Sequence, residues 1–135
     1  AGRRVGDLSG GQRQKVHLGR ALVGDPSALL LDEPTSALDL KHRLEVMDLV
    51  VTDVRDRGLA GLVAIHDINL AARYCDRVAL LHEGSVYAVG SPDVLTPETV
   101  RTVYGVDVTV HDHDGRRLIV PEAPAESDAS AYTRL

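Results

Sequence analysis

The order of helices and apolar strands is the feature that most constrains the fold of this chain. Residues 28–31 (Ala-Leu-Leu-Leu) and residues 61–65 (Gly-Leu-Val-Ala-Ile) are continuous apolar runs. A strand without polar alternation is expected to be buried on both faces, which is typical of a parallel sheet. Residues 40–57, between these runs, carry apolar side chains at helical spacing after the capping residue Asp39. Since another helix is expected over residues 9–23, the order helix–strand–helix–strand predicts an α/β core.

The elements expected after residue 67 are short and include antiparallel hairpins. They are a helix over 68–75, a hairpin over 77–90 that turns at Glu83-Gly84, helix starts at Ser91 and Thr96, and a hairpin that pairs 106–110 with 117–120. From Pro121 the chain is rich in Ala, Ser, Pro and Glu, and we expect it to be mobile. The predicted organisation is therefore one domain over residues 1–120 and a tail over 121–135.

Composition excludes several classes of function. The net charge of −5 and the absence of a basic cluster argue against nucleic-acid binding, and the aromatic content of 3% leaves no base-stacking surface. The single cysteine, Cys75, excludes an internal disulfide, fits a reducing cytosol and is expected to be a buried thiol on an apolar helix face. No apolar run approaches the ~20 residues of a membrane span, and no signal peptide is visible. Because the chain begins with Ala, almost directly in a motif, we expect it to be a fragment.

The first predicted helix begins with residues that suit an anion. Ser9 is a good N-cap, and Gly10 and Gly11 allow a ligand to approach the backbone closely. The free N–H groups and the positive dipole end of the helix favour a phosphate there. A capped helix start with two flexible glycines fits the same residues equally well. The helix is expected to stop at Gly24 and to place three side chains toward the core: Val16, Ala21 and Leu22.

Polar side chains follow both apolar runs. Asp32 and Glu33 come directly after the first run, and His66 follows the second. Asp32 and Glu33 are adjacent, so their side chains are expected to diverge. Because parallel strands end at one edge of a sheet, His66 is expected at the same edge as Asp32, one strand away. One carboxylate could hold a magnesium ion through water while the other faces an attacking water. A solvated acidic turn and an ordinary surface histidine are the alternatives.

Four segments carry a resemblance to a known family, in that family's order and approximate spacing: Leu8–Gln12 (LSGGQ), Leu29–Pro34 (LLLDEP), Ser36–Asp39 (SALD) and Ile65–Asp67 (IHD). They resemble the signature motif, the Walker B strand, the D-loop and the switch-histidine loop of ABC-transporter ATPases. The resemblance covers about residues 1–120. It implies the C-terminal half of an ABC-type P-loop ATPase domain, an α/β fold with a parallel sheet flanked by helices and small antiparallel hairpins at its C-terminal end.

The resemblance also implies roles for individual residues. Asp32 would position Mg²⁺, Glu33 would polarise the attacking water, and His66 would contact the γ-phosphate of ATP. In this family two copies sandwich two nucleotides, so the signature would face the nucleotide of the other copy and Asp39 would couple the two subunits. The signature residues implied to bind that nucleotide are Ser9, Gly10, Gly11 and Gln12.

Several of the family's motifs are absent from the 135 residues. No G-x-x-x-x-G-K-[ST] sequence occurs, and the only lysines are Lys15 and Lys41. The Q-loop and the aromatic residue that stacks on adenine are also missing. In the family's sheet order the phosphate-loop strand lies between the strands expected at 61–65 and 78–81, so each would expose an edge. We therefore expect that this piece alone does not hydrolyse ATP.

The second half of the chain is similar to the subfamily that serves iron–siderophore, haem and cobalamin importers, and two segments carry this similarity: Asn69–Asp76 and Leu95–Glu98. The similarity implies a peripheral subunit on the cytoplasmic face of the membrane, bound to transmembrane permease subunits. A periplasmic or surface substrate-binding protein would be an indirect partner. Cargo is chosen by those partners, and an iron–siderophore is the expected cargo.

The segment His-Asp-His-Asp-Gly at 111–115 contains residue types that bind metal ions, so a metal site is one interpretation. Alternate residues of a strand point to opposite faces, so a polar hairpin turn is the better interpretation.

Two other classes of function stay open. A non-transport ABC-type ATPase of chromosome maintenance would carry long coiled-coil heptads, which the sequence lacks. A truncated, non-catalytic ABC fragment that acts as a binding module is the other alternative.

Overall fold

The computed structural model describes residues 9–126 of the 135-residue chain, which divides into two compact units between Asp67 and Ile68. Leu8, the first residue of the signature-like segment, lies outside the described residues. Over residues 9–126, no helix combines the length and the apolar character that a membrane crossing requires.

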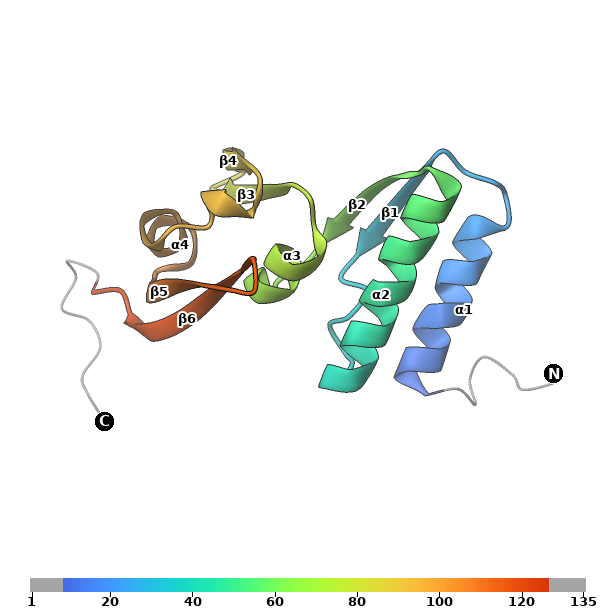
Figure 1. Ribbon diagram of the computed structural model, residues 1–135, viewed down its shortest axis with the longest axis horizontal. Coiled ribbons are helices and arrows are strands. Elements are labelled where there is room, and N and C mark those ends of the chain that lie inside the picture. The colour runs from blue at the N-terminus through green and yellow to red at the C-terminus, as the bar shows by residue number, and fades with distance from the viewer. Residues whose placement is uncertain (1–8, 127–135) are drawn as a thin grey trace. The chain divides into compact units, whose positions relative to one another are not determined.

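The first unit contains two helices and two strands (Figure 1): α1 (Gly10–Leu22), β1 (Ala28–Asp32), α2 (Leu40–Arg57) and β2 (Ala60–Ala64). β1 and β2 pair in parallel, from Ala28 opposite Ala60 to Asp32 opposite Ala64. The predicted α/β order is confirmed, and β2 begins one residue before the predicted strand.

Local chemistry explains where both helices begin and where α2 ends. α1 ends at Leu22 with Val23 as its C-cap, so the predicted stop at Gly24 is one residue too late. The Ser9 side chain accepts a hydrogen bond from the Gln12 backbone, and the Gln12 side chain accepts one from the Ser9 backbone, which forms a capping box. Asp39 caps α2 in the same position. α2 stops at Gly58, which adopts the left-handed conformation (φ 63°) that a residue without Cβ takes at little cost.

The core of the first unit joins both helices to one face of the β1–β2 sheet. Its buried members are Leu18, Leu22, Leu29, Leu38, Val46 and Val50. The prediction that both strands are buried on two faces is wrong. Leu30 is 72% exposed and Leu62 68%, because both helices of the first unit pack on the opposite face of the sheet. Ala21 is also exposed, contrary to prediction, because Leu18 and Leu22, one turn apart, fill the core instead.

The second unit follows the predicted order of short elements: α3 (Ile68–Tyr74), β3 (Val78–His82), β4 (Ser85–Gly90), the 3₁₀ helix η2 (Pro92–Val94), α4 (Pro97–Tyr104), β5 (Val106–His113) and β6 (Arg116–Pro124). β3 pairs antiparallel with β4, and β5 with β6. The first hairpin turns at Glu83 (φ 49°) and Gly84 (φ 76°), as predicted, with the two positive angles of a two-residue turn that matches strand twist. β6 continues to Pro124, so the first residues of the segment expected to be a mobile tail form a strand.

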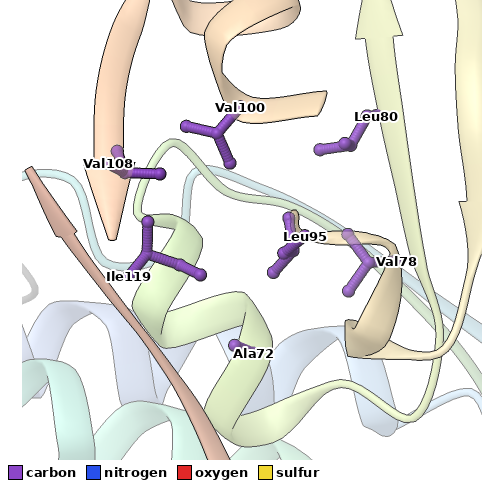
Figure 2. Close-up of a cluster of buried hydrophobic side chains, with 7 residues drawn as sticks. All are labelled: Ala72, Val78, Leu80, Leu95, Val100, Val108 and Ile119. Carbon is purple, nitrogen blue, oxygen red and sulfur yellow. The ribbon is translucent and has the colours of Figure 1, made fainter. Parts of the chain in front are cut away.

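A cluster of buried apolar side chains holds the second unit together (Figure 2). Its members come from α3, β3, α4, β5, β6 and the η2–α4 link: Ala72, Val78, Leu80, Leu95, Val100, Val108 and Ile119. Leu95 is fully buried, and Val100 and Ile119 are 1% exposed. The Asn69 amide ties α3 to β6, since it donates to Ile119 O (3.0 Å) and accepts from Ile119 N (2.7 Å). Cys75 is half-buried against this cluster rather than fully buried, and burial, with a smaller effect of Asp76, raises the pKa of its thiol.

Leu95→Ala tests this core. Removal of a fully buried leucine side chain loses transfer free energy and leaves a cavity, so we expect the free energy of unfolding of the chain to fall by about 2–5 kcal/mol. Leu81→Ala is the matched control, because Leu81 is 67% exposed; its effect is expected to stay below about 1 kcal/mol. Urea unfolding followed by circular dichroism measures both, and equal losses would contradict the assignment of Leu95 to the core.

Candidate functional site

The carboxyl ends of β1 and β2 bring Glu33 and His66 together. Glu33 directly follows β1, and its N–H donates to Ala64 O (2.9 Å), which extends the parallel ladder by one residue. His66 follows β2 by two residues, and its Nε2 lies 3.0 Å from Glu33 Oε1. The Glu33 side chain is 28% exposed and that of His66 87% exposed, so the pair is open to a ligand from solvent. His66 therefore lies at the carboxyl edge of the β1–β2 sheet, as predicted, and its contact there is with Glu33.

Glu33 is held by an uncommon backbone conformation and a tight turn. Its φ of 50° lies in the left-handed region, which a non-glycine residue rarely adopts. The Ser36 hydroxyl and the Ser36 N–H both donate to Glu33 O, at 3.2 Å and 3.3 Å, and Pro34 and Thr35 are buried. A strained backbone conformation persists only where the surrounding contacts hold it in place, and such residues are often found at functional sites. No sequence signal marked this conformation, because the residue is not a glycine.

Asp32 is the last residue of β1 and is exposed. Among the described residues its carboxylate has no hydrogen-bond or ion-pair partner, so it is available to a cation. The described residues contain no group of three or more His, Cys, Asp or Glu that could hold a metal ion by themselves. Magnesium in nucleotide sites is bound by one or two carboxylates together with phosphates and water. Asp32 could therefore supply one carboxylate to a magnesium ion that phosphates and water also bind.

The start of α1 presents the predicted anion-binding features. Ser9 and Gly10 are exposed, and the N–H groups of Gly10 and Gly11 belong to the first turn, whose amides have no acceptor within a helix. Gln12 is also exposed, and its side-chain oxygen is 3.1 Å from Ser9 N. Gly11 differs from its neighbours because it is buried. The Ser9 and Gln12 side chains thus order the turn, and the backbone supplies the free donors.

Asp39 caps α2 and holds His42. Its Oδ1 accepts from the backbone N of His42 (2.9 Å) and lies 2.7 Å from His42 Nδ1. The backbone hydrogen bond, followed by the side-chain bond, lowers the pKa of the Asp39 carboxyl. Arg43 Nε donates to Leu38 O (2.8 Å), and Arg43 Nη1 lies 3.9 Å from Asp67 Oδ2. The sequence analysis did not predict these contacts of His42 and Arg43. The signal that could have indicated the His42–Asp39 contact is a histidine three residues after a capping aspartate.

The His-Asp-His-Asp-Gly segment lies at the end of the predicted β5–β6 hairpin, but His111–His113 belong to β5, which is longer than predicted. Asp114 (φ 50°) and Gly115 (φ 74°) form the turn itself. His113 Nε2 lies 3.5 Å from Asp114 Oδ2, and both side chains are more than 80% exposed (81% and 87%). The segment is therefore a polar hairpin end.

Comparison with known proteins identifies similar chains. The family model described as ABC transporter matches residues 1–36. The hemin import ATP-binding protein of Pseudomonas aeruginosa is 50% identical over 128 residues, which cover 89% of this chain and 50% of that protein. An ABC transporter ATP-binding protein of Methanocaldococcus jannaschii is 45% identical over 119 residues, which cover 88% of this chain and 47% of that protein. The chain spans about half the length of the curated relatives it matches.

Solved structures of ABC transporters and ATP-binding cassettes are also similar to this chain. A metal-chelate type ABC transporter in an inward-facing conformation matches with a TM-score of 0.76 and 27% identity, over 91% of this chain and 50% of that chain. A dimeric ATP-binding cassette, MJ0796, bound to ADP and inorganic phosphate, matches with a TM-score of 0.57 and 38% identity, over 64% of this chain and 37% of that chain. The first of these structures matches most of the chain, and the second matches about two thirds of it.

Asp39→Asn tests the charged cap of α2. The lowered pKa means that the ionised carboxylate stabilises the folded chain at pH values above the ordinary carboxyl range, and that this contribution is lost as pH falls through the folded-state pKa. Asparagine also caps helices but does not titrate. Between about pH 7 and about pH 3 the melting temperature of the parent should therefore fall more than that of Asp39→Asn. Parallel pH dependences in thermal unfolding would contradict this role of the charge.

Proposed function

Because the chain is part of an ABC transporter ATP-binding domain, we propose that it belongs to an ATPase subunit that powers an ABC importer. The observation that carries the proposal is the 3.0 Å contact between Glu33 and His66 at the ends of two parallel strands. An acidic residue and a histidine at this edge can orient and activate a water molecule. The high identity to ATP-binding proteins supports ATP as the ligand.

In the proposed reaction Glu33 accepts a proton from the water whose oxygen bonds to the γ-phosphorus, while the bond from that phosphorus to the β–γ bridging oxygen breaks and ADP leaves. His66 orients the Glu33 carboxylate and donates to a γ-phosphate oxygen, which its exposed position permits. Asp32 would hold the magnesium ion of Mg-ATP through water, and the ion would supply positive charge that offsets the charge of the phosphates. The positive φ of Glu33 sets the direction in which its side chain leaves the end of β1.

The start of α1 would act on a nucleotide held by a second copy. The backbone N–H groups of Gly10 and Gly11, with Ser9, offer donors and the positive end of a helix dipole to a γ-phosphate. A solved cassette of similar fold is dimeric. The 135 residues contain no G-x-x-x-x-G-K-[ST] sequence, so the proposal assigns the binding of the nucleotide phosphates to a segment outside them. Asp39, at the start of α2, would couple the two subunits.

The proposed cargo class is a metal chelate. One relative is a hemin import ATP-binding protein, and one solved structure is a metal-chelate type transporter. Uptake of an iron–siderophore or a related chelate fits both. The subunit would bind permease subunits at the cytoplasmic face of the membrane, and a substrate-binding protein would deliver the cargo to the permease.

Glu33→Gln tests the chemistry in a chimera, in which this chain replaces the matching half of the Pseudomonas aeruginosa hemin import ATP-binding protein. Glutamine keeps the size of the side chain but cannot accept the proton, so we expect turnover to fall at least about a hundred-fold while ATP binding is retained. A phosphate-release assay and an ATP-binding titration separate the two effects.

Glu98→Gln is the matched control, since Glu98 is an exposed residue of α4, and it should leave turnover unchanged. Turnover by Glu33→Gln close to the parent rate would contradict the role of Glu33 as the base.

The unfused 135-residue chain should bind Mg-ATP weakly and not hydrolyse it, because it has no phosphate loop.

A further inference from the structure

We infer that His42 is a positioning residue that fixes the place of the Ser9–Gln12 turn relative to Asp39, and that Gly11 is required because it packs against the His42 ring. The inference rests on the proposed function, in which the Ser9–Gln12 turn binds a phosphate. The inference explains the glycine at position 11 by its packing against α2, and not by the close approach of a ligand to its backbone.

The burial of Gly11 is the first observation. A Cβ added to Gly11 would lie 2.6 Å from His42 Cδ2, 3.0 Å from His42 Cγ and 3.3 Å from His42 Cβ. A Cβ added to Gly10 would lie 3.2 Å from Leu38 Cδ2. Gly19, on the same helix, has no atom within 4 Å of that position. Gly10 therefore faces Leu38, just before α2, and Gly11 faces His42, in the first turn of α2, so a Cβ at either position would crowd the packing of the two helices.

The second observation is that the His42 ring is fixed in place. Its Nδ1 lies 2.7 Å from Asp39 Oδ1. An ionised carboxylate accepts hydrogen bonds only, and the lowered pKa keeps Asp39 ionised, so Nδ1 is the donor. Rotation about χ1 would break this bond, and it would not move the His42 Cβ, which is itself close to Gly11. The ring therefore cannot move aside cheaply for a methyl group at Gly11.

A third contact continues the same interface one turn further along both helices. Lys15 follows Gly11 by four residues and Glu45 follows His42 by three, and Lys15 Nζ lies 3.3 Å from Glu45 Oε2. The two helix starts are thus joined by the close approach of Gly11 to His42 and by this ion pair. Displacement of His42 would shift the first turn of α1, whose N–H groups are the proposed phosphate donors.

Two explanations of Gly11 make different predictions for a double variant. If Gly11 is required for packing, His42→Ala removes the clash that Gly11→Ala creates, and the second change repairs the first. If Gly11 is required because the phosphate approaches its backbone, the added methyl group is harmful with or without the His42 ring. His42→Ala preserves the α2 cap, because Asp39 Oδ1 also accepts from the backbone N of residue 42.

The first experiment measures unfolding of the 135-residue chain for Gly11→Ala, His42→Ala and the double variant, with Gly19→Ala as the control methyl group. We expect Gly11→Ala to lower the melting temperature and the double variant to lie above the sum of the two single effects. Gly19→Ala should not lower the melting temperature, because its methyl group meets no atom and alanine favours the helix. Additive effects of Gly11→Ala and His42→Ala would overturn the inference.

The second experiment measures kcat and KM for ATP in the chimera described above. We expect Gly11→Ala to lower kcat by about ten-fold or more with a smaller change in KM, and the double variant to return to within about three-fold of His42→Ala. In His42→Asn the side-chain amide can still donate a hydrogen bond to Asp39. In His42→Leu the side chain is bulky but has no donor, so the His42→Asn variant should retain more activity than the His42→Leu variant.

A folded double variant with no more activity than Gly11→Ala would overturn the inference, as would a higher kcat for His42→Leu than for His42→Asn. An inactive parent chimera would instead contradict the proposed function. In that case the unfolding cycle alone decides whether Gly11 packs against His42.

Discussion

The parallel pairing of β1 with β2 is the constraint on which the candidate site depends. Its register places Asp32 opposite Ala64, and the next hydrogen bond, from Glu33 N to Ala64 O, carries the ladder past the strand. Glu33 and His66 therefore meet although they are far apart in sequence. A shift of one residue would turn every side chain of a strand to the opposite face and separate them. The core side chains that α1 and α2 place on one face of the sheet, among them Leu18 and Val46, fix this register.

Capping groups connect this edge to the rest of the first unit. The turn that follows Glu33 leads to Asp39, where one carboxylate caps α2 and holds the His42 ring. That ring in turn packs against Gly11 at the start of α1. The proposed phosphate donors are thus positioned by short polar contacts, and a hydrophobic core supports them. The second unit has its own core around Leu95 and Ile119.

Local sequence signals predicted local structure well. The caps at Ser9 and Asp39, the stop at Gly58 and the turn at Glu83-Gly84 follow from hydrogen-bonding groups and backbone preferences of single residues. The sequence could not predict that Leu30 is exposed, or that α1 buries Leu18 and not Ala21. Burial depends on which segments pack against each face of a sheet or helix. The same holds for the positive φ of Glu33 and the contact of His42, which arise only when distant segments meet. The edge position of Glu33 and His66 was predictable because parallel strands end together.

The most direct measurement asks whether the Ser9–Gln12 turn acts on a nucleotide held by another copy. One chimeric subunit carries Ser9→Asp, which keeps a capping side chain but sets a carboxylate against the phosphates. The other lacks the phosphate-loop lysine of the relative's half. If the turn acts across a dimer, both lesions fall on one composite site of the mixed dimer, the second site is intact, and about one ATP is occluded per dimer. If the turn acts within its own chain, both sites are damaged and no ATP is occluded, which would contradict the proposed function.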